Sequence, residues 1–458
     1  MNWKQRHRFR AFVTNTLWFG PVLAMLVAMG VAPLLRELDR QLNPSWPSFT
    51  PDAARTLLGV LLASILTFIT FLFSSLLLVV QLASAQLTPR VISRAFNDRS
   101  VRIAAVILVF CYTLSLNVLA YVRETVPQLS MAVCALGSLV CIGLFLFLVD
   151  RVGRLVRPVT VLTSIGREAR LLIESFYPTL LNEPGVRRAE QSVIENLPTP
   201  EVVTNLDDVG VLLAFDDAGL IELARKHDCV IELIPQVGDF VSVETPLFHV
   251  YGARTPIAAT TLLQSIALGP ERTMEQDPLF AFRVIVDIAS KALSPAINDP
   301  TTAVLALDQI HHLLRLIGSR RLDTGHEFDP SGRLRLMYRT PDWPDFVTIA
   351  ITEIRQFGRD SIQIVRRLNA MLEQLVRRLP EERRPLLLNE LHCVQSDARR
   401  TFVGAHDEAL AKTSDSQGLG GVPEAGGPVE PVGEAGANYC SPVAPPTGTP
   451  ADGGAGLR

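Results

Sequence analysis

The residues best suited to chemistry lie between positions 283 and 302. Arg283, Asp287 and Lys291 are spaced four residues apart, so a helix would place them on one face. Their charges alternate, which is typical of an exposed network that neutralises itself. The alternative is an anion site, because a helix starting at Pro300 would offer free N–H groups to a phosphate-bearing ligand, although Asp299 as N-cap would fill part of it. The candidate residues are Arg283, Asp287, Lys291, Ser294, Asn298, Asp299, Thr301 and Thr302.

A second candidate site is a polar stripe within the apolar stretch Thr56–Pro89. At 100° per residue its small and polar side chains fall within an arc of about 60°. They are Thr56, Ala63, Thr67, Thr70, Ser74, Gln81, Ala85 and Thr88. Such a stripe either packs against another helix, which is the commoner use, or lines a water-filled path. We expect Asn117 to hydrogen-bond to Gln81 or Ser74, so the candidate residues are Thr67, Thr70, Ser74, Gln81 and Asn117.

Other patterns give no support for an enzyme. His311 and His312 near Asp308, and Glu390 near His392, lack a recognisable metal-ligand spacing. The chain has no P-loop, GxSxG or HExxH motif. We therefore expect no catalytic residues, no metal and no cofactor.

Four long apolar segments near the N-terminus must position the polar stripe. Only 19% of the 458 residues are charged, the net charge is −3 and the mean hydropathy is +0.26, which excludes a disordered chain and a basic nucleic-acid binder. The uncharged runs are Leu17–Leu35, Thr56–Pro89, Ile103–Val122 and Thr125–Val149. A bilayer is crossed by about 20 apolar residues as a helix. The sequence therefore predicts four transmembrane helices and a lipid bilayer as partner.

The basic residues predict the orientation. Eleven Lys and Arg residues flank the spans on one side, in the N-terminus, between spans two and three, and after span four. Four lie on the other side, at Arg36, Arg40, Arg55 and Arg123. By the positive-inside rule both termini are cytoplasmic. The first span is too long for a cleaved signal peptide.

The rest of the chain is predicted to be an intracellular body. We assign 1–150 to the four-helix transmembrane domain and 151–196 to a juxtamembrane helical linker interrupted at Pro158. Residues 197–270 form a small α/β domain, 271–411 a helical cytoplasmic domain and 412–458 a disordered tail rich in Gly and Pro. The predicted fold class is thus an all-α membrane domain followed by a cytoplasmic α+β domain and a mainly helical C-terminal region.

Local patterns within this body give finer expectations. Asp277-Pro278 and Asp299-Pro300 are typical N-caps followed by proline at the first helical position. One continuous helix of about 50 Å is expected from Trp343 to about Leu379. The segment Val237–Leu247 is similar to the hairpin of biotinyl/lipoyl-type modules, with Glu244 in place of a glycine and without an acceptor lysine.

The run Phe282–Ala303 resembles the signature of a bacterial family of predicted membrane proteins, domain of unknown function 2254. The similarity in layout also includes the four spans, the Val237–Val241 turn and the later segment Ile354–Ser361. The resemblance implies a bacterial inner-membrane protein and brings no activity with it.

Three functions remain open from the sequence, and the least favoured is an enzyme that acts on a lipid or nucleotide, with Arg283, Asp287 and Lys291 as its best site. The first is an oligomeric, channel-like or passive transport protein, supported by the polar stripe and by the lack of charged residues deep in the spans, which argues against a proton-driven pump. The alternative is a membrane-anchored sensor or scaffold without transport activity. A homo-oligomer is expected in the first case, no nucleic acid is expected as a partner, and protein partners are not predicted.

Overall fold

The structure is a computed structural model that describes residues 2–7, 9, 18–42, 49–86, 88, 98–123, 126–155, 157–183, 197–205, 209–322 and 325–421. Several sequence predictions lie outside these residues. They are residues 43–48 between the first two predicted spans, the basic residues Arg8, Arg10, Arg90 and Arg94, the last part of the predicted linker at 184–196, and most of the predicted tail, from 422 onward.

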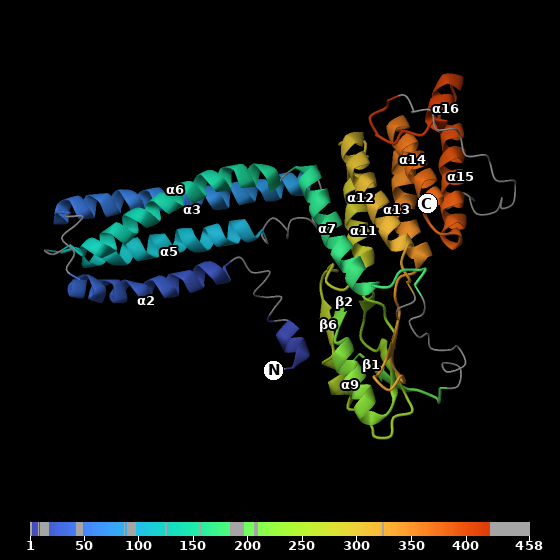
Figure 1. Ribbon diagram of the computed structural model, residues 1–458, viewed down its shortest axis with the longest axis horizontal. Coiled ribbons are helices and arrows are strands. Elements are labelled where there is room, and N and C mark those ends of the chain that lie inside the picture. The colour runs from blue at the N-terminus through green and yellow to red at the C-terminus, as the bar shows by residue number, and fades with distance from the viewer. Residues whose placement is uncertain are drawn as a thin grey trace, which may run out of the picture.

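Four long helices form a bundle at one end of the molecule (Figure 1). They are α2 (Phe19–Leu42), α3 (Pro51–Gln86), α5 (Arg99–Tyr121) and α6 (Gln128–Leu155). Each is long and apolar enough to cross a membrane. A body of helices and sheets follows the bundle and ends in a helical C-terminal region, so the predicted fold class is confirmed. We call the end of the bundle that lies next to the body the body end, and the opposite end the far end.

The bundle is packed through small residues and has an apolar interior. Ala24, Ala28 and Ala32 form the buried side of α2, and a Cβ on Gly20 would lie 2.8 Å from the Val106 side chain of α5. Small residues allow such close approach of membrane helices. Larger side chains fill the space between the helices, namely Leu58, Leu114, Val118 and Met131 towards the far end and Ile65, Leu72, Leu108 and Leu148 towards the body end.

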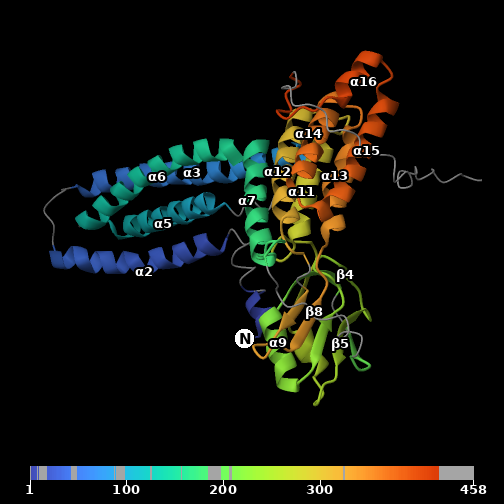
Figure 2. The same cartoon turned by 45° about the vertical axis from the view of Figure 1, so that its right-hand side comes forward.

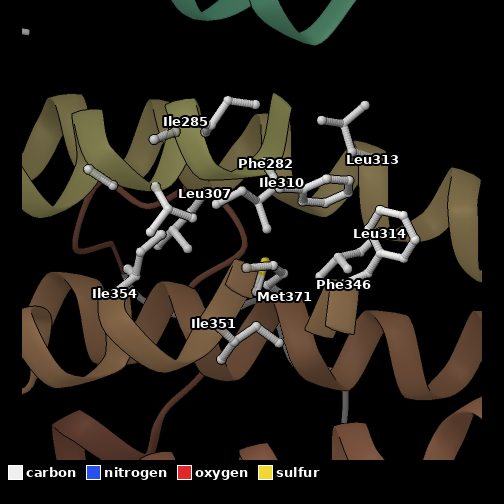
Figure 3. Close-up of a cluster of buried hydrophobic side chains, with 14 of the residues drawn as sticks. Phe282, Ile285, Leu307, Ile310, Leu313, Leu314, Phe346, Ile351, Ile354 and Met371 are labelled. Carbon is white, nitrogen blue, oxygen red and sulfur yellow. The ribbon is translucent and has the colours of Figure 1, made fainter. Parts of the chain in front are cut away.

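The helical part of the body surrounds one large core. Its elements are α7 (Pro158–Phe176), α11 (Pro278–Ala292), α12 (Pro300–Gly318), α13 (Trp343–Gly358), α14 (Ile362–Arg378), η2 (Glu381–Arg383), α15 (Arg384–Thr401) and α16 (Ala405–Lys412). The predicted caps are present, because Asp277 accepts from the Phe280 N–H at 2.9 Å and Asp299 from the Thr302 N–H at 3.1 Å. Figure 3 shows the core between α11, α12, α13 and α14, with Phe282, Leu307, Phe346 and Met371 at its centre.

Two small sheets lie beside these helices (Figure 2). The strands are β1 (Glu201–Thr204), β2 (Gly210–Phe215), β3 (Val230–Leu233), β4 (Phe240–Val241), β5 (Pro246–Tyr251), β6 (Ile266–Gly269), β7 (His326–Phe328) and β8 (Leu334–Tyr338), with helices α9 (Asp217–His227) and α10 (Ala259–Leu263). One sheet has the order β1-β5-β3-β8-β7 and the other β4-β2-β6. Since β8 pairs in parallel with β3, strands from both sides of residue 270 form one sheet.

The predicted hairpin at Val237–Leu247 requires correction. Its two strands do not pair with each other, because β4 pairs with β2 in the smaller sheet and β5 pairs with β1 and β3 in the larger one. The chain crosses between the sheets at residues 242–245. Glu244 has a φ of 64° there, in the left-handed region that glycine adopts most easily, which explains why the similar motif carries glycine at this position.

The single long helix predicted from Trp343 to Leu379 is also wrong. It is divided into α13 and α14 by a break at residues 359–361. A Cβ on Gly318 would lie 2.7 Å from Leu379 and 3.1 Å from Trp343, so the end of α14 returns to the start of α13. The two helices are therefore antiparallel, and the apolar stripe that they share is buried within the body.

The segment after α16, residues 413–421, is held against α14 by a buried cation. The Arg366 side chain is 1% exposed. Its guanidinium donates to the carbonyl oxygens of Thr413 at 3.1 Å, Gly420 at 3.1 Å and Gly421 at 2.6 Å. Asp415 accepts from the N–H groups of residues 417, 418 and 420 and so shapes the segment. These contacts hold the chain against α14 as far as residue 421, nine residues past Lys412, where α16 ends.

These contacts predict that residues 413–421 contribute to the stability of the protein and that residues 422–458 do not. Ending the chain after Lys412 removes the three carbonyl acceptors of Arg366. A hydrogen bond to a charged group contributes about 1.5–3 kcal/mol net, and water that reaches the uncovered guanidinium restores part of this loss. We expect a loss of about 3 kcal/mol in the free energy of unfolding. A chain ending after Gly421 is the matched control and should unfold at the same temperature as the full chain. Equal thermal midpoints for the two shortened chains would contradict the stabilising role of the contacts between Arg366 and residues 413–421.

Candidate functional site at the junction of bundle and body

Helix α11 brings two of the predicted charged residues into one ion-pair network. The Arg283 guanidinium donates to Glu353 of α13 through both terminal nitrogens, one at 2.7 Å. Its Nε donates to Asp287, one turn along α11, at 2.6 Å. Arg283 lowers the pKa of Glu353 below its usual range because it hydrogen-bonds to the carboxylate. The two-pronged pair fixes the orientation of α13 against α11.

Lys291 does not join this network but reaches the membrane bundle. Its Nζ donates to the backbone carbonyl oxygen of Ser84 at 2.5 Å, across 207 residues of sequence. Ser84 lies in the last turn of α3. The preceding residue, Ala83, is 4% exposed and is part of the body's core together with Val161, Leu162 and Ile165 of α7. The end of membrane helix α3 is therefore built into the body.

The contact has a simple physical basis. The last four carbonyl groups of a helix have no partner within it, and the C-terminal end of a helix carries a partial negative charge. A lysine ammonium satisfies both, since it donates a hydrogen bond and carries a positive charge. Lys291 thus acts as a C-terminal cap for a helix that ended long before it in the sequence. We call the contact between Lys291 and Ser84 the α3 cap.

The connection that follows Lys291 is a tight structural turn. The Ser294 hydroxyl donates to the Lys291 carbonyl oxygen at 2.7 Å, and Asn298 has a φ of 48° in the left-handed region. Asp299 accepts from the Thr302 N–H and, at 2.6 Å, from the Thr302 hydroxyl. Its carboxylate therefore occupies the place where an anion would bind, while Thr301 is exposed. The geometry favours a cap over an anion site.

The polar stripe of α3 faces away from the other three helices. Thr56, Ala63, Thr67, Thr70, Ser74 and Gln81 are all exposed. Thr88, which the stripe was also expected to include, follows α3 and is buried, and the side chain of Ala85 lies outside the described residues. The opposite side of α3, with Leu58, Ile65, Leu72 and Leu76, is buried in the bundle. The Thr67 and Thr70 hydroxyls donate to carbonyl oxygens one turn earlier in α3, at 2.9 and 3.0 Å. The stripe is thus an outer face of the bundle and does not line a path within one chain.

The predicted hydrogen bond from Asn117 to Gln81 or Ser74 is wrong. The Asn117 amide instead donates to the Thr113 carbonyl oxygen at 2.8 Å within α5. Arg55, at the start of α3, donates to the carbonyl oxygens of Val122 and Arg123 just after α5. Asn117 therefore lies near the far end of the bundle, whereas Gln81 lies near the body end.

Asp39 is a buried structural residue near the end of α2. Helix α2 continues to Leu42, and the Asp39 carboxylate is 8% exposed. It accepts from the Leu129 N–H at 2.6 Å and the Ser130 N–H at 3.0 Å, so it caps the start of α6. The sequence could have indicated this position, because Asp39 comes seven residues after Ala32 and residues seven apart lie on the same face of a helix.

His311 and Asp308, which the sequence places close together, lie beside a buried arginine. Arg367 donates to Asp308 at 2.7 Å and lies 3.5 Å from His311 Nδ1. Burial, together with the charge of Arg367, lowers the pKa of His311 to about 4. Within the part of the chain that the structure describes, no three His, Cys, Asp or Glu side chains gather as a metal site would require.

The α3 cap predicts the effect of removing the Lys291 ammonium. In Lys291→Met the Ser84 carbonyl loses a charged donor, and we expect the free energy of unfolding to fall by about 1–2 kcal/mol. Thermal unfolding of the full chain in detergent measures the change. Lys291→Arg keeps a cationic donor and is the control, expected to lie close to the wild type. A Met variant as stable as the wild type would contradict the cap.

Comparisons with known proteins agree with this layout. A family model described as a predicted membrane protein, DUF2254, matches residues 14–374, which include both partners of the α3 cap. Two uncharacterised proteins of Mycobacterium tuberculosis and one of Mycobacterium bovis are each 23% identical over 416 residues, which cover 87% of this chain and 79% of the relative. No solved structure shows a significant match. The chain belongs to the predicted membrane protein family DUF2254.

Proposed function

We propose that the protein is a channel-like or passive transport protein in which several copies surround a path lined by α3. The observation that carries the proposal is the outward position of the polar stripe along α3. In the described part of a single bundle, mainly apolar side chains fill the space between the helices. A path therefore needs the outer faces of neighbouring copies.

The chemistry of the stripe supports contact with water or with another copy. The Thr67 and Thr70 hydroxyls are satisfied within α3 and would tolerate lipid. Among the described residues, Ser74 and Gln81 make no side-chain hydrogen bond, and a primary amide facing hydrocarbon is unfavourable. A second copy or a column of water would supply the missing partners.

The α3 cap gives the body a means to control such a path. Since the last turn of α3 is packed into the body's core, a movement of α11 would be transmitted to the helix that carries the stripe. We therefore assign the body the role of a gate or collar and assign the chain no enzymatic activity. The eleven-to-four distribution of basic residues supports placement in a bacterial inner membrane with both termini in the cytoplasm.

The test combines oligomeric state with flux. We expect the full chain to form a ring of several copies in detergent, and we expect its reconstitution into liposomes to increase the passage of potassium, chloride or glycerol. In the variant Thr67→Val/Thr70→Val/Ser74→Ala, flux should fall about tenfold or more. Ser138→Ala removes a buried hydroxyl that bonds within α6 and should leave flux unchanged.

A monomer that produces no flux would contradict the proposal. That outcome would favour the alternative, a membrane anchor for the body. A ring with unchanged flux in the triple variant would also contradict the assignment of the stripe to the path.

A further inference from the structure

Helix α7 runs across the body end of the bundle instead of extending α6. Helix α6 ends at Leu155 and α7 begins at Pro158, whose ring cannot continue the preceding helix. In both views α7 lies between the bundle and the pair α11 and α12, and it crosses the direction of the membrane helices (Figures 1 and 2). A bilayer around the bundle would therefore run alongside α7.

One side of α7 is fixed to the body. Val161, Leu162, Ile165, Ala169 and Ile173 are buried there. The approach to α12 is close, since a Cβ on Gly166 would lie 2.2 Å from the amide oxygen of Gln309. These contacts leave the opposite side of α7 pointing away from the body, towards the bundle.

That opposite side combines apolar and basic residues at helical spacing. Val159, Thr163, Arg167 and Leu171 follow one another every four residues, and Val159 and Leu171 are 48% and 62% exposed. Arg157, just before the helix, is exposed as well. Among the described residues neither Arg157 nor Arg167 forms an ion pair. Glu174 is held by Arg170 at 3.0 Å and is 3.9 Å from Arg320.

We propose that this face of α7, defined by Arg157, Val159, Thr163, Arg167 and Leu171, is a docking surface for the anionic lipid headgroups of the surrounding membrane. An exposed amphipathic face with arginines beside large aliphatic residues is the composition that binds at a bilayer surface. The charges are complementary to anionic lipids, and the apolar side chains match the boundary of the acyl chains.

The length of α3 places α7 at the level of the lipid headgroups. Helix α3 has 36 residues, or about 54 Å, whereas the hydrocarbon layer is about 30 Å thick. The last turns of α3 therefore extend into the headgroup region, and there they meet α7 and Lys291. Arg151 and Arg154, in the last turns of α6, lie at the same level but are paired with Asp98 and Asp150, so among the described residues the unpaired positive charge there comes from Arg157 and Arg167 of the docking surface. The docking surface is independent of the proposed transport function.

The test is a titration of the full chain in detergent with short-chain phosphatidylglycerol, followed by thermal unfolding. Phosphatidylglycerol should raise the midpoint, while phosphatidylcholine of the same chain length should not. In Arg157→Gln/Arg167→Gln, the phosphatidylglycerol concentration that produces half of the shift in the thermal midpoint should rise about tenfold. The reason is that each arginine near an anionic surface contributes appreciably to binding. Both side chains are exposed, so the variant is expected to fold.

Arg359→Gln is the matched control. Arg359 is 62% exposed and lies at the break between α13 and α14, so its removal should leave the titration unchanged. An unchanged titration in the double variant would overturn the proposal. Equal shifts with both lipids would overturn it too, because the headgroup charge would then not be recognised.

Discussion

The hydrogen bond from the Lys291 ammonium to the Ser84 carbonyl oxygen is the contact on which the layout of this protein depends. It meets a requirement that every helix has, a partner for its last carbonyl groups, by using a residue from the body. With Ala83 buried in the body's core, the end of α3 becomes part of the body. The neighbouring pair of Arg283 and Glu353 then fixes α13 to α11, so the charged residues of the signature join three helices in one junction.

The same junction explains how the membrane bundle is joined to the body. Among the described contacts, α3 meets the body through the α3 cap and α6 through the turn into α7 at Pro158, and the N-terminal segment also meets the body, where His7 lies 2.9 Å from Glu275. A simple anchor would need only one covalent tether. Two attachments to different membrane helices restrain the rotation of α3, and α3 is the helix that turns its hydroxyl and amide side chains outward. The buried apolar side of α3 turns the polar stripe outward, and the contacts made in the body hold the end of the same helix.

Local signals allowed much of this architecture to be predicted. The four spans, the break at Pro158 and the caps at Asp277 and Asp299 each depend on residues close together in the sequence. The errors arose where distant contacts decide the structure. The crossing at Glu244 separates two strands that seemed adjacent, and the break at residues 359–361 lets α14 return along α13. The partner of Lys291 is 207 residues away, and no periodicity reveals it. Asp39 was missed because its cap lies on another helix.

Amide hydrogen exchange over residues 80–86 tests the central claim most directly. It reports on the last turns of α3 alone, in the full-length protein, and separates a local cap from a general effect on stability. The account predicts faster exchange of these amides in Lys291→Met than in the wild type, with exchange in α5 unchanged and with Lys291→Arg close to the wild type. Exchange at the end of α3 that is the same in all three proteins would contradict it.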